Sequence, residues 1–366
     1  MNGVLVVGAG LAGTRCAESL RSGGYERPIV VVGEEHCGPY ERPALSKDFL
    51  AGKRSADTLQ LRGSDWWDER NIEMQLGTRV EGIDAARKTA SLGGHTVHWE
   101  HVVLATGARP RRLPGTPLPG AHVLRSLADA VALRETIGPG SRLVIIGAGF
   151  VGAEVASTCA GLGAEVVILE AEPVPLSRAI GPEVGRLLAD RWLACGIDVR
   201  LGARIERIEG NVVELGDGTV LPYDALLIAI GAEPAGELLD SPRGIQTDAF
   251  GRTSFPGVFA CGDVAHFGGS RVEHWTSASG QAATVAAAIL GEPRPYAETP
   301  YFWSDQFGVR LQMVGSTEGC TTVEIEGDTD SFAARYTDDE GRIRAVLLAN
   351  RPREIAAARR ELAAAA

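Results

Sequence analysis

Glycines at one fixed spacing occur twice in the chain, and each set could bind a phosphate through backbone N–H groups. They are Gly8, Gly10 and Gly13 in the first copy, and Gly147, Gly149 and Gly152 in the second. At this spacing the first glycine permits a tight turn, the second lets the backbone approach a pyrophosphate, and the third lets a helix pack closely on a strand. The positive end of the following helix adds to the attraction for phosphate. The sequence therefore predicts two dinucleotide sites.

An acidic residue follows the next apolar run after each glycine set. Glu34 comes after Ile29–Gly33, and Glu170 comes after Glu165–Leu169. In dinucleotide-binding folds an acid at this place accepts hydrogen bonds from the ribose hydroxyls. The segment Glu170-Ala-Glu172 offers no Arg or Lys for a 2′-phosphate, so the second site is predicted to prefer NADH over NADPH.

The glycines need a strand in front of them and a helix behind them. Val4–Val7 and Leu143–Ile146 are apolar runs of the kind that form buried parallel strands, and alanine-rich helical stretches follow both glycine sets. Each copy is therefore predicted to be a Rossmann-like domain.

The second copy is predicted to be inserted in the first. Val102–Pro110 and Ala225–Pro234 match each other as strands that end in a turn, and each would return the chain to the other domain. The crossings are expected near Pro110–Pro119 and Gly231–Gly236. The predicted domains are residues 1–110 with 231–295, then 111–230, then 296–366.

A further acid, Asp263, ends the segment that begins at Thr253. This segment is predicted to be a short strand that delivers Asp263 to the start of a helix, with the helix itself over Thr276–Leu290. An acid in that place can accept hydroxyl groups of a ligand, and the alternative interpretation is a simple helix cap.

The last segment differs from the rest. Alternating stretches at residues 310–315, 321–325 and 345–348 predict antiparallel strands, and a helix is expected from Glu354, with Ala363–Ala366 frayed. The predicted fold class is therefore α/β, with two Rossmann-like dinucleotide-binding domains and a C-terminal α+β domain that carries an antiparallel sheet.

Composition narrows the function. The 366 residues are 45% hydrophobic and carry a net charge of −11, which predicts globular domains and argues against a nucleic-acid partner. No apolar run is long enough for a bilayer, so a cytoplasmic protein without a membrane partner is expected. The six cysteines lack C-x-x-C spacing, so no metal, iron–sulfur cluster or sequence-local redox disulfide is expected.

These pieces, in this order, resemble the two-dinucleotide flavoprotein reductases over nearly the whole chain. Three segments resemble one group among them, the FAD-dependent NADH:ferredoxin reductases of oxygenase systems (the putidaredoxin reductase and biphenyl dioxygenase ferredoxin reductase family). They are Tyr40-Glu-Arg42-Pro43-Ala-Leu-Ser46-Lys47, Val272-Glu273-His-Trp275 and Tyr301-Phe-Trp303-Ser-Asp305-Gln306-Phe-Gly308.

The resemblance implies that the first glycine set binds FAD and the second binds NAD. The implied FAD residues are Gly8, Gly10, Ala12, Gly13, Glu34, Arg42, Lys47, Val80, Thr106, Gly107, Arg125, Gly262, Asp263 and Trp275. The implied NAD residues are Gly147, Gly149, Gly152, Glu154, Glu170 and Gly231. For Trp275, which would pack beside the flavin ring, the alternative is a plain core aromatic.

Lys47 and Glu154 are the charged pair that the resemblance brings together where flavin and nicotinamide meet. A buried cation there would stabilise negative charge on the reduced flavin, and the glutamate would hold the cation and orient the nicotinamide amide. Without the motif context, either residue would be interpreted as a solvated surface charge.

The implied activity is hydride transfer from NADH to FAD, followed by release of single electrons to a separate [2Fe–2S] ferredoxin that serves an oxygenase. Acids outnumber bases after Ala297, although ferredoxins are typically acidic. Ferredoxin steering would then need a local basic cluster. The candidates are Arg342, Arg344, Arg351 and Arg353.

Two other functions stay open. Cys37-Gly38-Pro39-Tyr40 faintly resembles the Cys-Gly-x-Pro-Tyr of NADH oxidases and coenzyme A disulfide reductases, in which one cysteine cycles at the flavin, although the spacing differs. A redox-sensing interaction protein that binds FAD and NADH, as apoptosis-inducing factor does, is the alternative of another class.

Overall fold

The computed structural model describes residues 3–115 and 118–365. The chain divides into two compact units. The first comprises Met1–Glu41, Asp57–Arg109 and Ala232–Pro300, and the second comprises Arg42–Ala56, Pro110–Gly231 and Tyr301–Ala366.

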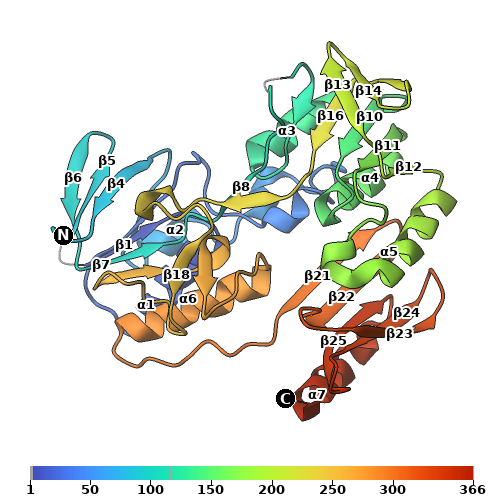
Figure 1. Ribbon diagram of the computed structural model, residues 1–366. Coiled ribbons are helices and arrows are strands. Elements are labelled where there is room, and N and C mark those ends of the chain that lie inside the picture. The colour runs from blue at the N-terminus through green and yellow to red at the C-terminus, as the bar shows by residue number, and fades with distance from the viewer. Residues whose placement is uncertain (1–2, 116–117, 366) are drawn as a thin grey trace. The chain divides into compact units, whose positions relative to one another are not determined.

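A five-stranded parallel sheet forms the centre of the first unit (Figure 1). Two of its strands, Val4–Val7 and Ile29–Val32, are buried along their whole length, which explains why they are uniformly apolar runs. Two helices, α1 (Leu11–Ser22) and α6 (Trp275–Ile289), pack against each other. The strand order is β19 (Val258–Ala260), β7 (His101–Leu104), β1 (Val4–Val7), β2 (Ile29–Val32) and β3 (Ile72–Gln75).

Smaller elements complete the first unit. An antiparallel meander consists of β4 (Val80–Asp84), β5 (Thr89–Leu92) and β6 (His95–His98). The others are α2 (Ser64–Asp68), the parallel pair β18 (Ile245–Thr247) with β20 (Ala265–Phe267), and the pair β8 (Ala108–Pro110) with β17 (Ala232–Pro234).

A second five-stranded parallel sheet lies in the second unit and repeats the pattern of the first. Its order is β12 (Asp198–Leu201), β11 (Glu165–Glu170), β10 (Arg142–Ile146), β16 (Ala225–Ile228) and β9 (Ala121–His122). The helices are α3 (Leu127–Thr136), α4 (Phe150–Gly161) and α5 (Ser177–Ala194), and the antiparallel strands are β13 (Ile205–Glu209), β14 (Val212–Leu215) and β15 (Val220–Pro222).

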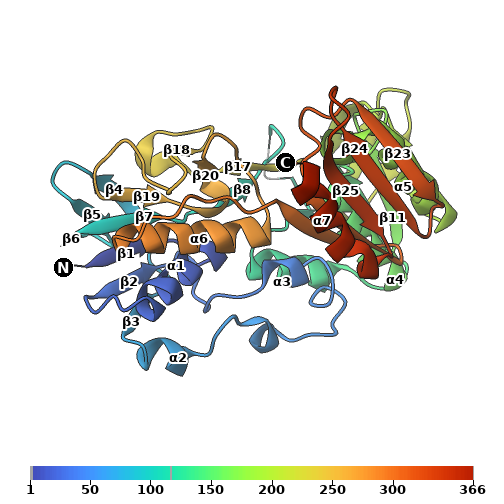
Figure 2. The same cartoon turned by 90° about the horizontal axis from the view of Figure 1, so that it is seen from below.

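The C-terminal segment is an antiparallel sheet with the helix α7 (Ile355–Ala365) against β25 (Figure 2). The order is β21 (Tyr301–Gln306), β22 (Val309–Gly315), β25 (Ile343–Ala349), β24 (Phe332–Thr337) and β23 (Thr322–Gly327). This sheet shares one hydrophobic core with the parallel sheet and α5 of the same unit, where Trp192 packs near Phe307 with ring centroids 5.9 Å apart. The Tyr336 hydroxyl donates to the carbonyl oxygen of Ile180 at 2.7 Å.

The predicted fold class is confirmed, as are both glycine turns, the helix near Thr276–Leu290 and the antiparallel C-terminal strands. One prediction was wrong in detail. Asp263 enters a 3₁₀ turn, Gly262–Val264, and strand β20 then separates it from α6, so Asp263 does not start a helix. The side chain at the N-cap of α6 is that of His274. The cap alternative for Asp263 therefore does not apply to α6.

Two segments are grouped differently from the predicted domains. Residues 42–56 belong to the second unit, and residues 296–300 belong to the first, where the Tyr296 N–H donates to the carbonyl oxygen of Ala249 at 2.8 Å. The helix α7 continues through Ala365, so Ala363 and Ala364 are helical, and residue 366 lies outside the described residues. Residues 116–117 of the predicted first crossing also lie outside them.

None of the helices in the described part of the chain is long and apolar enough to cross a membrane.

Candidate functional site

The first glycine turn is a point where three stretches of the first unit come very close. Gly8 has φ +115°, and a Cβ there would collide with the carbonyl oxygen of Ala105, the residue before Thr106. A Cβ on Gly13 would collide with the carbonyl oxygen of Gly8, because α1 packs directly on the turn. The glycines at both positions are therefore required by backbone contact.

The second glycine turn repeats this geometry. Gly147 has φ +105°, and a Cβ there would collide with the carbonyl oxygen of Ala229. A Cβ on Gly152 would collide with the carbonyl oxygen of Gly147. Gly231, with φ +96°, accepts the N–H of Arg111 at 2.9 Å through its carbonyl oxygen.

The middle glycine of each turn is different. A Cβ built on Gly10 or on Gly149 meets no protein atom within 4 Å. Both glycines are the N-cap residues of their helices, α1 and α4, and no side chain caps either helix. The open space lies where N–H groups at the positive end of a helix can receive a pyrophosphate. Both turns therefore fit a dinucleotide.

The two predicted ribose acids lie at the ends of equivalent strands but have different surroundings. Glu34 is exposed and forms an ion pair with Arg79 at 3.1 Å, next to the buried Val80. Glu170 accepts the N–H of Ala148 at 2.8 Å with Oε2, which holds its carboxylate beside the second glycine turn.

Thr106, Gly107, Gly262 and Ala12 surround the first turn. The Thr106 hydroxyl donates to the carbonyl oxygen of Ala235 at 2.7 Å, and Gly107 adopts φ +73°. A Cβ on Gly262 would come within 2.7 Å of the Ala12 Cβ. The sequence analysis missed Gln281, whose Oε1 accepts the Gly262 N–H at 2.8 Å and fixes this backbone.

Asp263 and Trp275 lie in the first unit on either side of the segment that leads to α6. The carbonyl oxygen of Asp263 accepts a hydrogen bond from Arg271 at 3.1 Å. Burial lowers the pKa of His274 to about 4, although the charge of Asp263 acts in the opposite direction. His274 is therefore neutral at pH 7.

Lys47 and Glu154 are brought together in the second unit, as predicted, although their numbers in the sequence differ by 107. Lys47 Nζ lies 2.6 Å from Glu154 Oε2, and the Glu154 side chain is 7% exposed. A buried charge of this kind persists only when it is paired and hydrogen-bonded. The alternative of two solvated surface charges is excluded by this burial.

Two serines that the sequence analysis did not assign donate hydrogen bonds to the Glu154 carboxylate. Ser46 donates to Oε2 at 2.6 Å, and Ser304 donates to Oε1 at 2.7 Å. Ser304 in turn accepts from Gln306 Nε2 at 3.2 Å, which directs the serine proton towards Glu154. Both serines lie in segments quoted above for the family resemblance, so that resemblance was the available signal.

Arg42 and Arg125 also lie in the second unit. Arg42 Nη1 donates to the carbonyl oxygen of Arg125. The Arg125 N–H donates to Asp129, whose carboxylate forms a capping box with Ser126 at the start of α3. The two predicted cofactor residues are therefore neighbours on a capped helix start.

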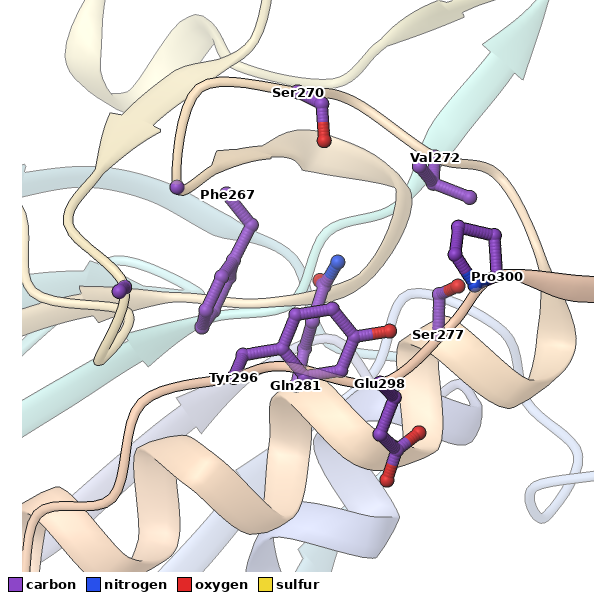
Figure 3. A pocket seen from close by; sticks show the side chains of 10 residues that line it. Phe267, Ser270, Val272, Ser277, Gln281, Tyr296, Glu298 and Pro300 are labelled. Atoms are coloured by element: carbon purple, nitrogen blue, oxygen red, sulfur yellow. The ribbon is translucent and has the colours of Figure 1, made fainter. Parts of the chain in front are cut away.

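A separate pocket lies in the first unit and has a volume of about 270 Å³ (Figure 3). Phe267 and Tyr296 form an edge-on ring pair on its wall, and the Tyr296 hydroxyl, Ser277 and Glu298 are polar groups around it. None of the predicted cofactor residues lines it, and Gln281 links it to Gly262.

Comparison with known proteins agrees with this geometry. Residues 2–282 match the pyridine nucleotide-disulphide oxidoreductase family, and residues 301–366 match the reductase C-terminal family. The chain is 38% identical to the ferredoxin–NAD(+) reductase subunit of the benzene 1,2-dioxygenase system of Pseudomonas putida, over 98% of this chain and 92% of that protein. It is 39% identical to the ferredoxin–NAD(+) reductase component of the biphenyl dioxygenase system of Paraburkholderia xenovorans, over 90% of this chain and 84% of that protein.

Among solved structures, the covalent putidaredoxin reductase–putidaredoxin complex matches with a TM-score of 0.94 and 32% identity, over all of this chain and 93% of that chain. The chain belongs to the ferredoxin–NAD(+) reductase family. Its cofactors are FAD and NAD(H), in agreement with the two dinucleotide sites predicted from the sequence.

In this ferredoxin–NAD(+) reductase family member, all six cysteines are free thiols. Burial raises the pKa of Cys159 and of Cys261 to about 12, so neither forms a thiolate at neutral pH. Cys37, the residue of the cycling-cysteine alternative, is partly buried and lies in the first unit.

Two of the four arginines proposed for ferredoxin steering are already paired with carboxylates. Arg342 contacts Asp338 at 3.0 Å and Glu340 at 2.7 Å, and Arg351 contacts Glu326 at 3.3 Å. Arg344 and Arg353 are exposed, and among the described residues neither has an acidic partner within ion-pair distance. The partner of Arg351 lies on strand β23, whereas the partners of Arg342 lie two and four residues before it in the same turn.

Proposed function

We propose that this reductase takes hydride from NADH, through FAD held at the first glycine turn, and passes single electrons to a [2Fe–2S] ferredoxin that serves a monooxygenase or dioxygenase. Two observations carry the proposal. Both glycine turns leave open space at their middle glycine, and Lys47 and Glu154 form a buried ion pair. Relatives named as reductase components of dioxygenase systems support the choice of electron acceptor.

The assignment of residues to the two cofactors is part of the proposal. For FAD these are Gly8, Gly10, Ala12, Gly13, Glu34, Arg42, Lys47, Val80, Thr106, Gly107, Arg125, Gly262, Asp263 and Trp275. For NAD they are Gly147, Gly149, Gly152, Glu154, Glu170 and Gly231.

FAD, when bound, accepts two electrons as hydride and can release them one at a time, which nicotinamide cannot readily do. The chain's own residues bind, orient and neutralise charge. Glu154 is held in one position by Ser46 and Ser304, and it keeps the Lys47 ammonium beside it. A fixed cation of this kind stabilises developing negative charge without reorganisation during the reaction.

We also propose a cytoplasmic location, since the NADH that the reductase would consume is a metabolite of the cytoplasm.

The first experiment is anaerobic stopped-flow spectroscopy of the purified flavoprotein with NADH and then with a [2Fe–2S] ferredoxin. Flavin bleaching reports hydride transfer, and the visible absorbance of the ferredoxin reports electron transfer. Fast bleaching followed by fast ferredoxin reduction is expected. If no candidate ferredoxin accepts electrons faster than the background rate, the proposal fails.

The cycling-cysteine alternative is tested with the Cys37→Ser variant. We expect unchanged turnover with ferredoxin, because no other thiol lies near Cys37 in the sequence and single-electron transfer needs none. A loss of turnover with electrons passing to oxygen or a disulfide would instead favour the NADH oxidase or coenzyme A disulfide reductase function.

A further inference from the structure

The peptide group that joins Ser46 to Lys47 is hydrogen-bonded at both ends. Its N–H, which belongs to Lys47, donates to the carbonyl oxygen of Ala44 at 3.1 Å. Its carbonyl oxygen, which belongs to Ser46, accepts the hydroxyl proton of Thr158 at 2.7 Å. A peptide group is planar, so these two bonds together fix the backbone from which the Lys47 side chain starts. Of the two bonds, only that from Thr158 reaches a different element, the helix α4.

The other end of the lysine, its ammonium group, has three acceptors. Nζ lies 2.6 Å from Glu154 Oε2, 3.1 Å from the carbonyl oxygen of Pro43 and 3.3 Å from Ser46 Oγ. An ammonium group has three N–H donors, so the set matches its capacity. Two of the acceptors belong to the segment that carries Lys47, and the third belongs to α4. The ammonium is therefore held between its own segment and this helix.

Thr158 and Glu154 lie one turn apart on the same face of α4. A threonine in a helix can donate its hydroxyl proton to the carbonyl oxygen four residues earlier, and Thr14 in α1 does so with Gly10 at 2.8 Å. Thr158 donates instead to Ser46, whose number in the sequence differs by 112. This hydroxyl group therefore links residues 42–56 to α4 and does not serve its own helix.

The Lys47–Glu154 pair thus depends on two links between the same two elements. One is the charged contact at Nζ, and the other is the neutral hydrogen bond from Thr158 to the backbone. Ser46 and Glu154 are 5% and 6% exposed, so little water reaches the region to replace a lost donor. If the backbone link is removed, the Lys47 side chain no longer starts from a fixed place relative to Glu154.

We propose that Thr158 is a positioning residue for hydride transfer, because its hydroxyl group holds the backbone of Lys47 against α4 and so places the ammonium beside Glu154. This inference rests on the proposed function, since Lys47 affects the reaction only if flavin and nicotinamide meet there. The helix α4 begins at the second glycine turn, with Gly149 as its N-cap. The helix that would receive the dinucleotide therefore also carries the group that places the lysine.

The test compares two variants of the holoenzyme. Thr158→Val keeps the shape of the side chain and removes the hydroxyl group, whereas Thr158→Ser keeps the hydroxyl group. The matched control is Thr317→Val. Thr317 is also partly buried in the second unit and also donates its hydroxyl proton to a distant carbonyl oxygen, that of Ala179 at 3.1 Å, but it contacts neither α4 nor residues 42–56 through this bond.

Two measurements are made on each variant. Anaerobic stopped-flow gives the limiting rate constant of flavin reduction and the KM for NADH. Acetylation with acetic anhydride, followed by mass spectrometry of peptides, gives the reactivity of the Lys47 amine without any turnover. Lys53, which is exposed in the same segment, is the internal reference for the reagent.

We expect Thr158→Val to lower the limiting rate constant roughly threefold to tenfold, because a displaced charge aligns the reacting groups less well. The KM for NADH should change by less than about twofold, because the glycine turn is untouched. Acetylation of Lys47 relative to Lys53 should become about threefold faster or more, because the amine is more often free of its acceptors. Thr158→Ser should restore the rate constant and the acetylation rate, and Thr317→Val should change neither.

The proposal requires both a slower flavin reduction and a faster acetylation of Lys47 in Thr158→Val. The absence of either change, or the same two changes in Thr317→Val, overturns it. If NADH does not reduce the flavin of the wild type, the proposed function itself fails, whatever the acetylation shows. Should Thr158→Val bind no flavin, Thr158→Ala removes the same hydroxyl group with the residue that most favours a helix.

Discussion

At the scale of single residues, the Glu154 carboxylate receives three donors from two distant stretches of the chain. Lys47 and Ser46 come from one of them, and Ser304 comes from strand β21. Ser304 is 0% exposed. A hydroxyl group in that position has no water to replace it if it is removed, so its loss should be measurable.

Replacement of Ser304 by Ala should leave Glu154 Oε1 without its donor. We expect a loss of roughly 1.5–3 kcal/mol in the free energy of unfolding, the usual range for a buried hydrogen bond to a charged group. The rate constant of flavin reduction by NADH should fall by roughly threefold to tenfold, because Glu154 is less firmly oriented. Ser304→Thr retains the hydroxyl and should recover most of the rate. Equal rates for Ala and Thr would show that Ser304 does not position Glu154.

His274 should make the protein less stable in mild acid. Its pKa in the folded state, about 4, lies below the unfolded value of about 6.5, so the unfolded state binds more protons between these values. The stability that neutral His274 gives is present above pH 6.5 and is lost as the pH falls towards 4. Between pH 7 and pH 5.5 the wild type should lose about 1 kcal/mol more than His274→Asn, which does not titrate. Urea unfolding at both pH values measures this, and identical losses would contradict it.

At the scale of elements, each strand–turn–helix unit uses its three glycines for different purposes. The outer two are needed by the fold itself, since a side chain there would collide with backbone of the same unit. The middle glycine faces open space, so only a bound ligand would require it to be glycine.

This difference predicts opposite outcomes for alanine at neighbouring glycines. Gly149→Ala should fold and retain its flavin, while the KM for NADH rises about tenfold or more because the methyl group displaces the pyrophosphate from the N–H groups. Gly152→Ala should instead lose stability by roughly 1–3 kcal/mol, the cost of overpacking against the Gly147 carbonyl. Thermal unfolding, flavin content and the KM for NADH separate the two. A normal KM for NADH in Gly149→Ala would show that the nucleotide does not bind at this turn.

At the scale of the whole molecule, the net charge of −11 conflicts with an acidic electron acceptor unless the positive charge is local. The C-terminal segment supplies such local positive charge only in part. Arg342 and Arg351 are neutralised by neighbouring carboxylates, whereas Arg344 and Arg353 are exposed without such partners among the described residues.

Charge reversal should therefore affect these arginines unequally. We expect Arg344→Glu with Arg353→Glu to raise the KM for an acidic [2Fe–2S] ferredoxin severalfold at low salt, with the effect fading at high salt, and to leave flavin reduction by NADH unchanged. Arg342→Glu is the matched control in the same segment and should have the smaller effect on association. Steady-state assays at two ionic strengths measure this, and a salt-independent effect would exclude electrostatic steering by these residues.

The sequence by itself determined the features that depend on neighbours along the chain. Buried parallel strands need continuous apolar runs, and the turns need glycine at positions with φ above +100°, so Val4–Gly8 and Leu143–Gly147 could be recognised from residue types alone. The segment from Gly262 to Trp275 was harder. Its short 3₁₀ turn and strand carry no strong periodicity, so the sequence did not predict them between Asp263 and the helix over Thr276–Leu290.

Tertiary structure alone decided which charges are neutralised and by what. Ser304 reaches Glu154 because β21 packs beside α4, a contact between segments 150 residues apart. Arg178 meets Glu172 because a packed loop and a left-handed Leu176 turn α5 back towards the end of β11. Ion pairs depend on distances of a few ångströms between side chains, and the spacing of residues in the sequence does not fix such distances.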